Sequence, residues 1–168
     1  MRKVIMLFLI MLPLVALAQN LRVNEVDKFT NKVIQQTRNE TLFTVNYMAS
    51  GFSHRFEFSI QRSDNNYTMF ASILLPEIVK YDESSKIYFL LENKEKVILN
   101  SNFIGLSGKK FANGYIFETS FSLSQEDVQT LKNSKVTDIR IEYMDGYYDR
   151  EIKDKKQSLI QQMLELFK

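Results

Sequence analysis

The sequence has no cysteine and no tryptophan, and it contains one histidine and two prolines among 168 residues. Without cysteine the chain can form no disulfide framework and offers no lipoprotein acylation site. Zinc and copper are held mainly by several imidazoles or thiolates, so a chain with a single histidine is not expected to bind either metal. We therefore expect a protein without a metal or other cofactor, stabilised by its hydrophobic core.

Signatures of catalysis are equally scarce. The one histidine, His54, lies by strand parity among phenylalanines, which favours a core imidazole over a catalytic base. No Gly-x-Ser-x-Gly sequence accompanies it. The glycine-containing segment 105–114 does not match a phosphate-binding loop, because Lys109-Lys110 is followed by Phe111 and a strand. We expect a non-enzymatic protein, and keep a hydrolase that uses carboxylates as an alternative.

The beginning of the chain has the pattern of a secretory signal peptide. Arg2 and Lys3 precede an apolar run over residues 4–18, which ends in the small-x-small sequence Ala16-Leu17-Ala18. The run of 15 residues is short for a helix that spans a bilayer. We expect residues 1–18 to be removed and the mature chain to start at Gln19. The pattern predicts an exported, soluble protein of the periplasm or the exterior, with no transmembrane segment.

The remaining chain, residues 19–168, is expected to form a single domain. It has 20 basic and 20 acidic residues. This balance gives no reason to expect a nucleic-acid partner, which would need a concentrated positive face. A domain of this size buries about 70% of the surface that its unfolded chain exposes, so it needs no disulfides.

Most of the chain reads as short strands. Residues 52–61 alternate between apolar and polar with a period of two, as expected of a half-buried strand. Residues 86–92 are apolar on both parities, which predicts a central strand covered on both faces. A short hairpin is expected around Thr30-Asn31-Lys32. Further strands are predicted at 42–49, 67–75, 96–100 and 115–123.

The segment 136–153 is expected to form a hairpin. Asp145-Gly146 suits a type I′ turn, whose two central residues need positive φ. That turn would place Arg140 opposite Glu151. One face of the hairpin is apolar and would face the core; it carries Ile139, Ile141, Tyr143, Tyr148 and Ile152, with Arg150 as the exception.

Two helices are expected. Ser124 and Asp127 form a capping-box pattern for a short helix at 124–132, and Asn133 is a plausible left-handed terminator. Asp154 can cap a C-terminal amphipathic helix whose apolar stripe is Leu159, Ile160, Met163, Leu164 and Phe167. The predicted fold is α+β: a mainly antiparallel sheet of about seven to nine strands, as a sandwich or partial barrel, with the C-terminal helix packed on it.

The candidate ligand-binding residues lie in the last hairpin. Arg150 falls on the predicted apolar face, where it either forms an ion pair or binds a ligand carboxylate between helix and sheet. Tyr143 and Tyr148 share that face. Tyr147 lies near the hairpin tip, where an exposed aromatic patch would mark binding.

These features favour a binding or interaction module for an unknown protein or small apolar ligand. The first alternative is a small-molecule or lipid carrier, whose sheet would curl round an apolar cavity of at least ~300 Å³ lined by phenylalanines. The hydrolase is the second alternative. It would require two acids, or an acid and His54, within hydrogen-bonding reach in a concave site.

Two stretches resemble small exported proteins of Gram-negative bacteria that have no assigned activity. They are LSQEDVQTLKNSKVTDIRIEYMDGYYDREIKDKKQSLIQQMLELF over residues 123–167 and VDKFTNKVI over residues 26–34. The resemblance implies an envelope or secreted location and a β-rich domain with a closing helix, and it implies no functional residues. In these proteins an aromatic or aliphatic residue is usual where this chain has Arg150.

Overall fold

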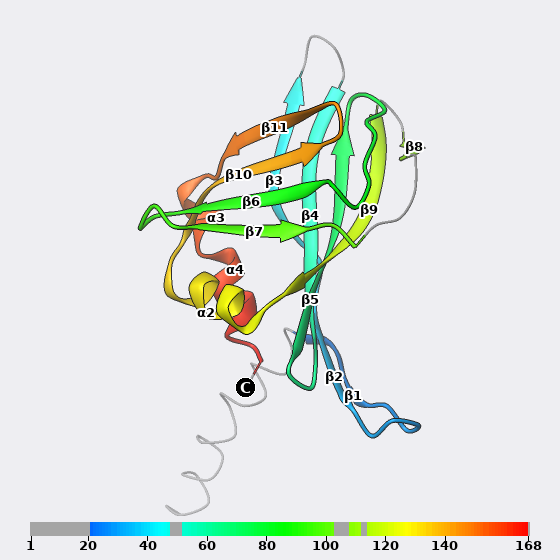
Figure 1. Ribbon diagram of the computed structural model, residues 1–168, viewed down its shortest axis with the longest axis vertical. Helices are drawn as coiled ribbons and strands as arrows, with labels where there is room; N and C mark the ends of the chain where they lie inside the picture. The colour runs from blue at the N-terminus through cyan, green and yellow to red at the C-terminus, as the bar shows by residue number, and fades with distance from the viewer. Residues whose placement is uncertain (1–20, 48–51, 103–107, 112–113, 168) are drawn as a thin grey trace, which may run out of the picture.

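The computed structural model describes residues 21–47, 52–102, 108–111 and 114–167. The predicted signal peptide, residues 1–18, lies outside these ranges. The described chain is mostly antiparallel β-structure with a few short helices (Figure 1), so the predicted α+β class is confirmed. The described chain has eleven strands, more than the seven to nine expected. One reason is that two short strands in succession pair with the same edge of one long strand.

The larger sheet, sheet A, contains seven strands in the order β1-β2-β4-β5-β9-β8, and β3 also pairs with β4. Its centre is β4, β5 and β9, which form long uninterrupted ladders. The bounds of the seven strands are β1 Leu21–Val26, β2 Val33–Thr37, β3 Glu40–Tyr47, β4 Phe52–Ser63, β5 Asn66–Leu75, β8 Lys109–Phe111 and β9 Gly114–Leu123.

The smaller sheet, sheet B, has the order β11-β10-β6-β7. Its strands are β6 Lys86–Leu91, β7 Lys96–Asn100, β10 Val136–Tyr143 and β11 Gly146–Glu151. Figure 1 shows these strands running across those of sheet A, so the two sheets form the layers of a sandwich.

The hydrophobic core fills the space between the layers. Sheet A contributes the predicted inward row of β4, where Phe56, Phe58 and Ile60 are at most 1% exposed. Sheet B contributes alternate residues of β6 and β10. The prediction that β6 is covered on both faces is wrong, because Tyr88 and Leu90 on its outer face are only half-buried.

The predicted short helix is α2, Gln125–Asn133. Its capping box is confirmed: the backbone N–H of Asp127 donates to the Ser124 hydroxyl, and the backbone N–H of Ser124 donates to the Asp127 carboxylate. The predicted left-handed terminator is wrong. Asn133 belongs to the helix, and Ser134 leaves it with an extended backbone because the chain continues directly into β10.

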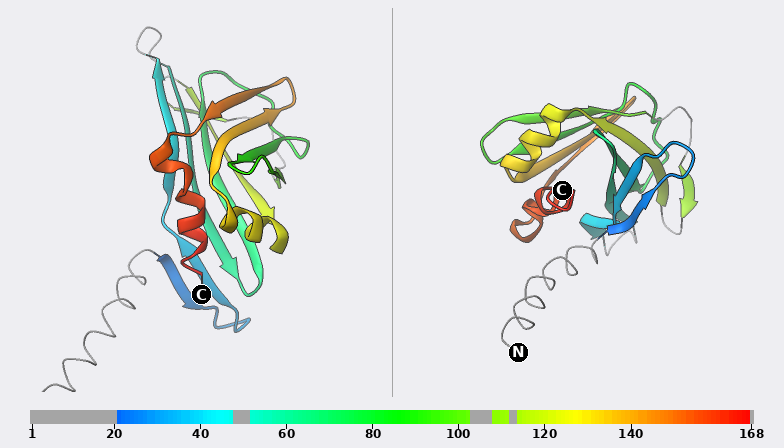
Figure 2. Two further views of the ribbon diagram at one scale, coloured as in Figure 1. Left: turned by 90° about the vertical axis from the view of Figure 1, so that its left-hand side faces the viewer. Right: turned by 90° about the horizontal axis from the view of Figure 1, so that it is seen from below.

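The C-terminal segment packs as predicted but is divided into α3, Asp154–Gln157, and α4, Leu159–Leu164, by a turn at Ser158. Asp154 begins α3 as a helical residue and is not its cap. The apolar stripe is confirmed, since Ile160, Met163, Leu164 and Phe167 are all buried. Figure 2 shows both helices along the open side of the sandwich. No described helix has the length and apolar character that a membrane span requires.

The last hairpin keeps its predicted faces but not its predicted register. Tyr143 pairs with Gly146 and Arg140 with Asp149, so the turn is Met144-Asp145, and neither residue has positive φ. Interactions beyond the turn explain this register. The Met144 N–H donates to the Lys80 carbonyl at 3.0 Å, and Arg140 makes two 2.6 Å bonds to Asp149. A shift of two residues leaves the inward face unchanged.

A break at residues 38–39 lets β4 pair with two successive strands. β2 pairs with one half of β4 and β3 with the other half. At the break the buried Thr37 hydroxyl accepts the backbone N–H of Ile60 at 3.0 Å. This side chain thus replaces a ladder hydrogen bond that the interrupted edge does not supply.

We expect Thr37→Val to lower the free energy of unfolding by about 1–3 kcal/mol, because it leaves the buried Ile60 N–H without an acceptor. Thr68→Val is the matched control, since Thr68 is half-buried on the outer face of β5, and it should change stability by less than about 0.5 kcal/mol. Urea denaturation of the two variants measures the difference. Equal stability would contradict this role for Thr37.

Candidate functional site

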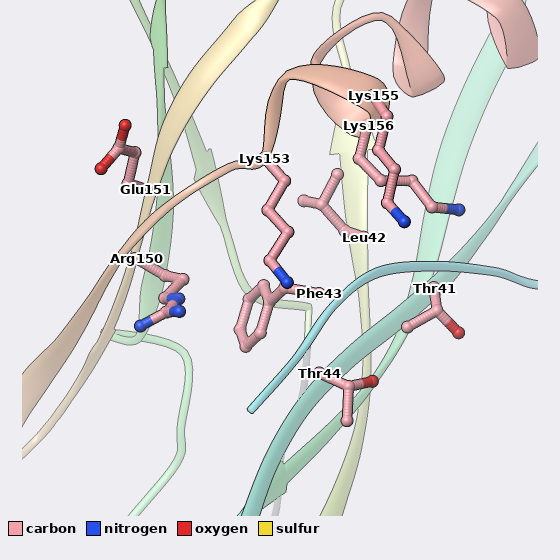
Figure 3. A pocket seen from close by; sticks show the side chains of 9 residues that line it. All are labelled: Thr41, Leu42, Phe43, Thr44, Arg150, Glu151, Lys153, Lys155 and Lys156. Atoms are coloured by element: carbon pink, nitrogen blue, oxygen red, sulfur yellow. The ribbon is translucent and has the colours of Figure 1, made fainter. Parts of the chain in front are cut away.

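A small cleft lies where the edges of the two sheets face each other. Among the described strands, β3 pairs only with β4 and β11 only with β10, so each has one edge without a neighbour from this set. The cleft between β3, β11 and α3 has a volume of about 210 Å³. We call it the seam cleft. Figure 3 shows the residues that line it: Thr41, Leu42, Phe43, Thr44, Arg150, Glu151, Lys153, Lys155 and Lys156.

The floor of the seam cleft is apolar because β3 contains a β-bulge. The register shifts between Thr41 and Phe43, which leaves Leu42 as the extra residue. Leu42 and Phe43 are therefore both buried, although a regular strand would turn them to opposite faces. The bulge also explains why the apolar pattern of this strand leaves its buried face undecided in the sequence.

Four cationic side chains surround this floor. Arg150 comes from the inward face of β11, and the lysines at 153, 155 and 156 come from the segment that starts α3. In Figure 3 the Lys153 side chain extends toward Phe43, and Glu151 points away from the cleft. Glu40 lies 3.8 Å from Lys156. The side chains around the cleft therefore carry an excess of positive charge.

An aromatic cluster continues the cleft floor toward the centre of sheet A. The Tyr148 ring lies edge-on to the His54 ring, with 4.3 Å between centroids, and its centroid is 5.9 Å from that of Phe43. Phe43 in turn stacks with Phe56 at 6.1 Å. These contacts fix Tyr148, two residues from Arg150 on the same face of β11.

His54 has a depressed pKa. Burial disfavours its charged form and is the main cause, and the positive charge of Arg150 acts in the same direction. The carboxylate of Glu77 opposes them by favouring the protonated imidazole. His54 is thus electrically coupled to the seam cleft through Arg150.

The structure divides the predicted binding residues between two surfaces. Arg150 lines the seam cleft, and Tyr148 lies beside it. Tyr143 is on the same inward face near the hairpin turn, where burial is the main cause that raises its pKa, followed by Glu77 and Asp145. Tyr147 lies on the opposite face, where the Arg140 guanidinium carbon is 4.1 Å from its ring centroid. These four residues do not form one site.

Sequence reasoning missed the lysines of the cleft. The cationic cluster Lys153, Lys155 and Lys156 is visible in the sequence as a basic run, but its period suits a solvated helix face equally well. Only the position of α3 beside β3 shows that the run faces a cleft. Among the residues that the structure describes, no three His, Asp or Glu side chains are grouped so that they could hold a metal ion.

Comparisons of the chain with protein-family models, with curated proteins and with solved structures found no match.

The chain has a single histidine, so its imidazole resonances can be followed directly by NMR. We expect His54 to titrate below its ordinary value of 6.5. Arg150→Gln should raise this pKa because it removes a nearby positive charge, and Glu77→Gln should lower it further. Arg22→Gln, on the exposed side of β1, is the control and should leave the pKa unchanged. An unchanged pKa in Arg150→Gln would contradict the coupling.

The lowered pKa of His54 makes the free energy of unfolding depend on pH. As pH falls through 6.5, the histidine of the unfolded chain takes up a proton before His54 of the folded chain does. The contribution of His54 to stability is therefore fully present above this pH and decreases below it. We expect His54→Gln to reduce the loss of stability between about pH 7.5 and pH 5.5, measured by denaturation at each pH. A variant with the same slope as the wild type would show that another group is responsible.

Proposed function

We propose that this protein is a non-enzymatic binding module that takes an anionic group, a phosphate or a carboxylate, in the seam cleft. The observation that supports this most directly is the set of four cationic side chains around a 210 Å³ cleft with an apolar floor. An isolated arginine on an inward sheet face is usually paired with a carboxylate. In the seam cleft three lysines line the same space as Arg150.

Arg150 is the central residue of the proposed site. Its planar guanidinium can donate two parallel hydrogen bonds to a carboxylate or phosphate, which a lysine cannot do. It is half-buried and lines the cleft together with Phe43, so the charge-assisted bonds form in a partly dehydrated position, where they are stronger than at an open surface. The lysines add attraction without fixing the orientation of the ligand.

The volume of the cleft limits what enters it. Drug-sized ligands occupy pockets of roughly 300–1,000 Å³, and the seam cleft is smaller. It fits a single anionic group with a short apolar extension against Leu42 and Phe43. We infer that the ligand is a small anion or the anionic end of a larger molecule whose remainder stays outside the cleft.

We further propose that the protein acts outside the cytoplasm, in the periplasm or the exterior. This rests on the basic start, the apolar run over residues 4–18 and the small-x-small sequence that ends it.

The two alternatives receive less support from the geometry. A lipid carrier would need phenylalanines around an open cavity, whereas Phe56, Phe58, Phe89 and Phe121 are at most 1% exposed within the packed core. A carboxylate hydrolase that works with two acids would need these acids to converge. Glu57 and Glu118 share a hollow on the outer face of sheet A, but they lie on either side of Ser72, so their backbones are about 10 Å apart.

We expect sodium pyrophosphate to perturb amide resonances at residues 41–44 and 150–156 in an NMR titration at constant ionic strength. Arg150→Gln should weaken binding by about 10- to 100-fold, as expected for the loss of charge-assisted bonds. Arg22→Gln removes the same charge from the exposed side of β1, away from the cleft, and should leave the affinity unchanged. Equal weakening by both substitutions, or shifts spread over the whole surface, would show nonspecific attraction and refute the site.

A further inference from the structure

The outer face of sheet B has an exposed apolar centre. The register of the four strands places Ile98, Tyr88, Arg140 and Asp149 in one row across it. A hollow of about 440 Å³ lies over this row and the next, and Tyr88, Leu90 and Ile98 line it. Ile98 is 48% exposed and Tyr147 is 59% exposed. Exposed apolar side chains on one face of a sheet can mark an interaction site.

The charges on this face are separated by sign. Lys86 and Lys96 lie on the β6–β7 half. On the β10–β11 half, Arg140 and Asp149 neutralise each other through two 2.6 Å bonds. The acids left on that half are Asp138, Glu142 and Glu151. The lysines therefore lie on the β6–β7 half together with Tyr88, Leu90 and Ile98, and the unpaired acids lie on the β10–β11 half.

We propose that this face binds the same face of a second copy of the chain. A two-fold axis that runs along the strands, between β6 and β10, places β7 on β11 of the partner and β6 on β10 of the partner. Each positive half then covers a negative half. A two-fold axis across the strands would place each strand on its own copy and bring the acids of β10 and β11 together, which disfavours that arrangement.

The cross-strand register predicts the pairs. Lys96, Leu90, Asp138 and Glu151 share one row, so Lys96 faces Glu151 of the partner subunit. Lys86 and Glu142 share another row, and Lys86 faces Glu142 of the partner subunit. The row between them brings Tyr88 to Arg140 of the partner subunit, a cation–π arrangement like the one that Arg140 makes with Tyr147.

The size of the face sets the strength of the association. Four strands about 4.8 Å apart and three outward rows give roughly 400 Å² on each copy. The total falls in the range of weak, transient interfaces. Its rim consists of exposed ion pairs, which salt screens. The dimer should therefore form at high protein concentration and dissociate as the salt concentration rises.

A charge swap tests the proposed register. In a homodimer of either single variant, Lys96→Glu or Glu151→Lys, both symmetry-related pairs consist of like charges. Each variant should therefore associate about tenfold more weakly than the wild type. An equimolar mixture of the two variants restores an opposite-charge pair at both positions and should recover association. Sedimentation equilibrium at low salt measures all three, and circular dichroism verifies that each variant is folded. Lys32→Glu, on the β1–β2 hairpin, is the control.

Association of the wild type that both variants reduce and the mixture restores supports the proposal. A wild type that stays monomeric to about 1 mM, near the weakest affinity such an interface would show, overturns it. Association that is unaffected by either variant, or that the mixture does not restore, also overturns it, because the contact would then lie elsewhere. Pyrophosphate binding at the seam cleft tests the proposed function separately in Lys96→Glu, since Lys96 is not among the residues that line the cleft, whereas Glu151 is one of them.

Discussion

The burial of the C-terminal apolar stripe against the open side of the sandwich is the contact on which the site depends. The facing edges of β3 and β11 are not paired with each other, so the core between the sheets would meet water there. Ile160, Met163, Leu164 and Phe167 are buried where the C-terminal segment covers this open side (Figure 2). α3 then lies beside β3, and the lysines of its first turn reach the remaining cleft. The seam cleft is thus the part of the gap that the C-terminal segment leaves open.

Local patterns in the sequence predicted the elements well. The alternation around Phe56 and Phe58 gave β4 and its inward face, and Ser124 with Asp127 located the start of α2, because strand parity and capping involve only neighbouring residues. The register of the last hairpin was predicted incorrectly from Asp145-Gly146. The contact between Met144 and Lys80 joins residues far apart in sequence and is absent from the local pattern.

The site was harder to predict than the fold. Arg150 could be singled out because a cation interrupts an apolar face, which is a local signal. Its neighbours could not, because Thr41 to Thr44 are more than a hundred residues away and meet Arg150 only when the two sheets pack. The bulge at Leu42 is also set by pairing with β4. On the outer face of sheet B, the strand register likewise determines which charged side chains are neighbours, and this register exists only once the sheet has formed.

The break at residues 38–39 separates a weakly attached hairpin from the rest of the sandwich. Beyond it the β1–β2 hairpin extends away from the sandwich (Figure 1), with Phe29 85% exposed and Val26 60% exposed at its tip. Its ladder with β4 covers three residue pairs and ends beside Thr37. The hairpin can therefore detach and reattach as a small cooperative unit while the sandwich stays closed, so its amide protons should exchange with solvent far sooner than those of β4 and β5.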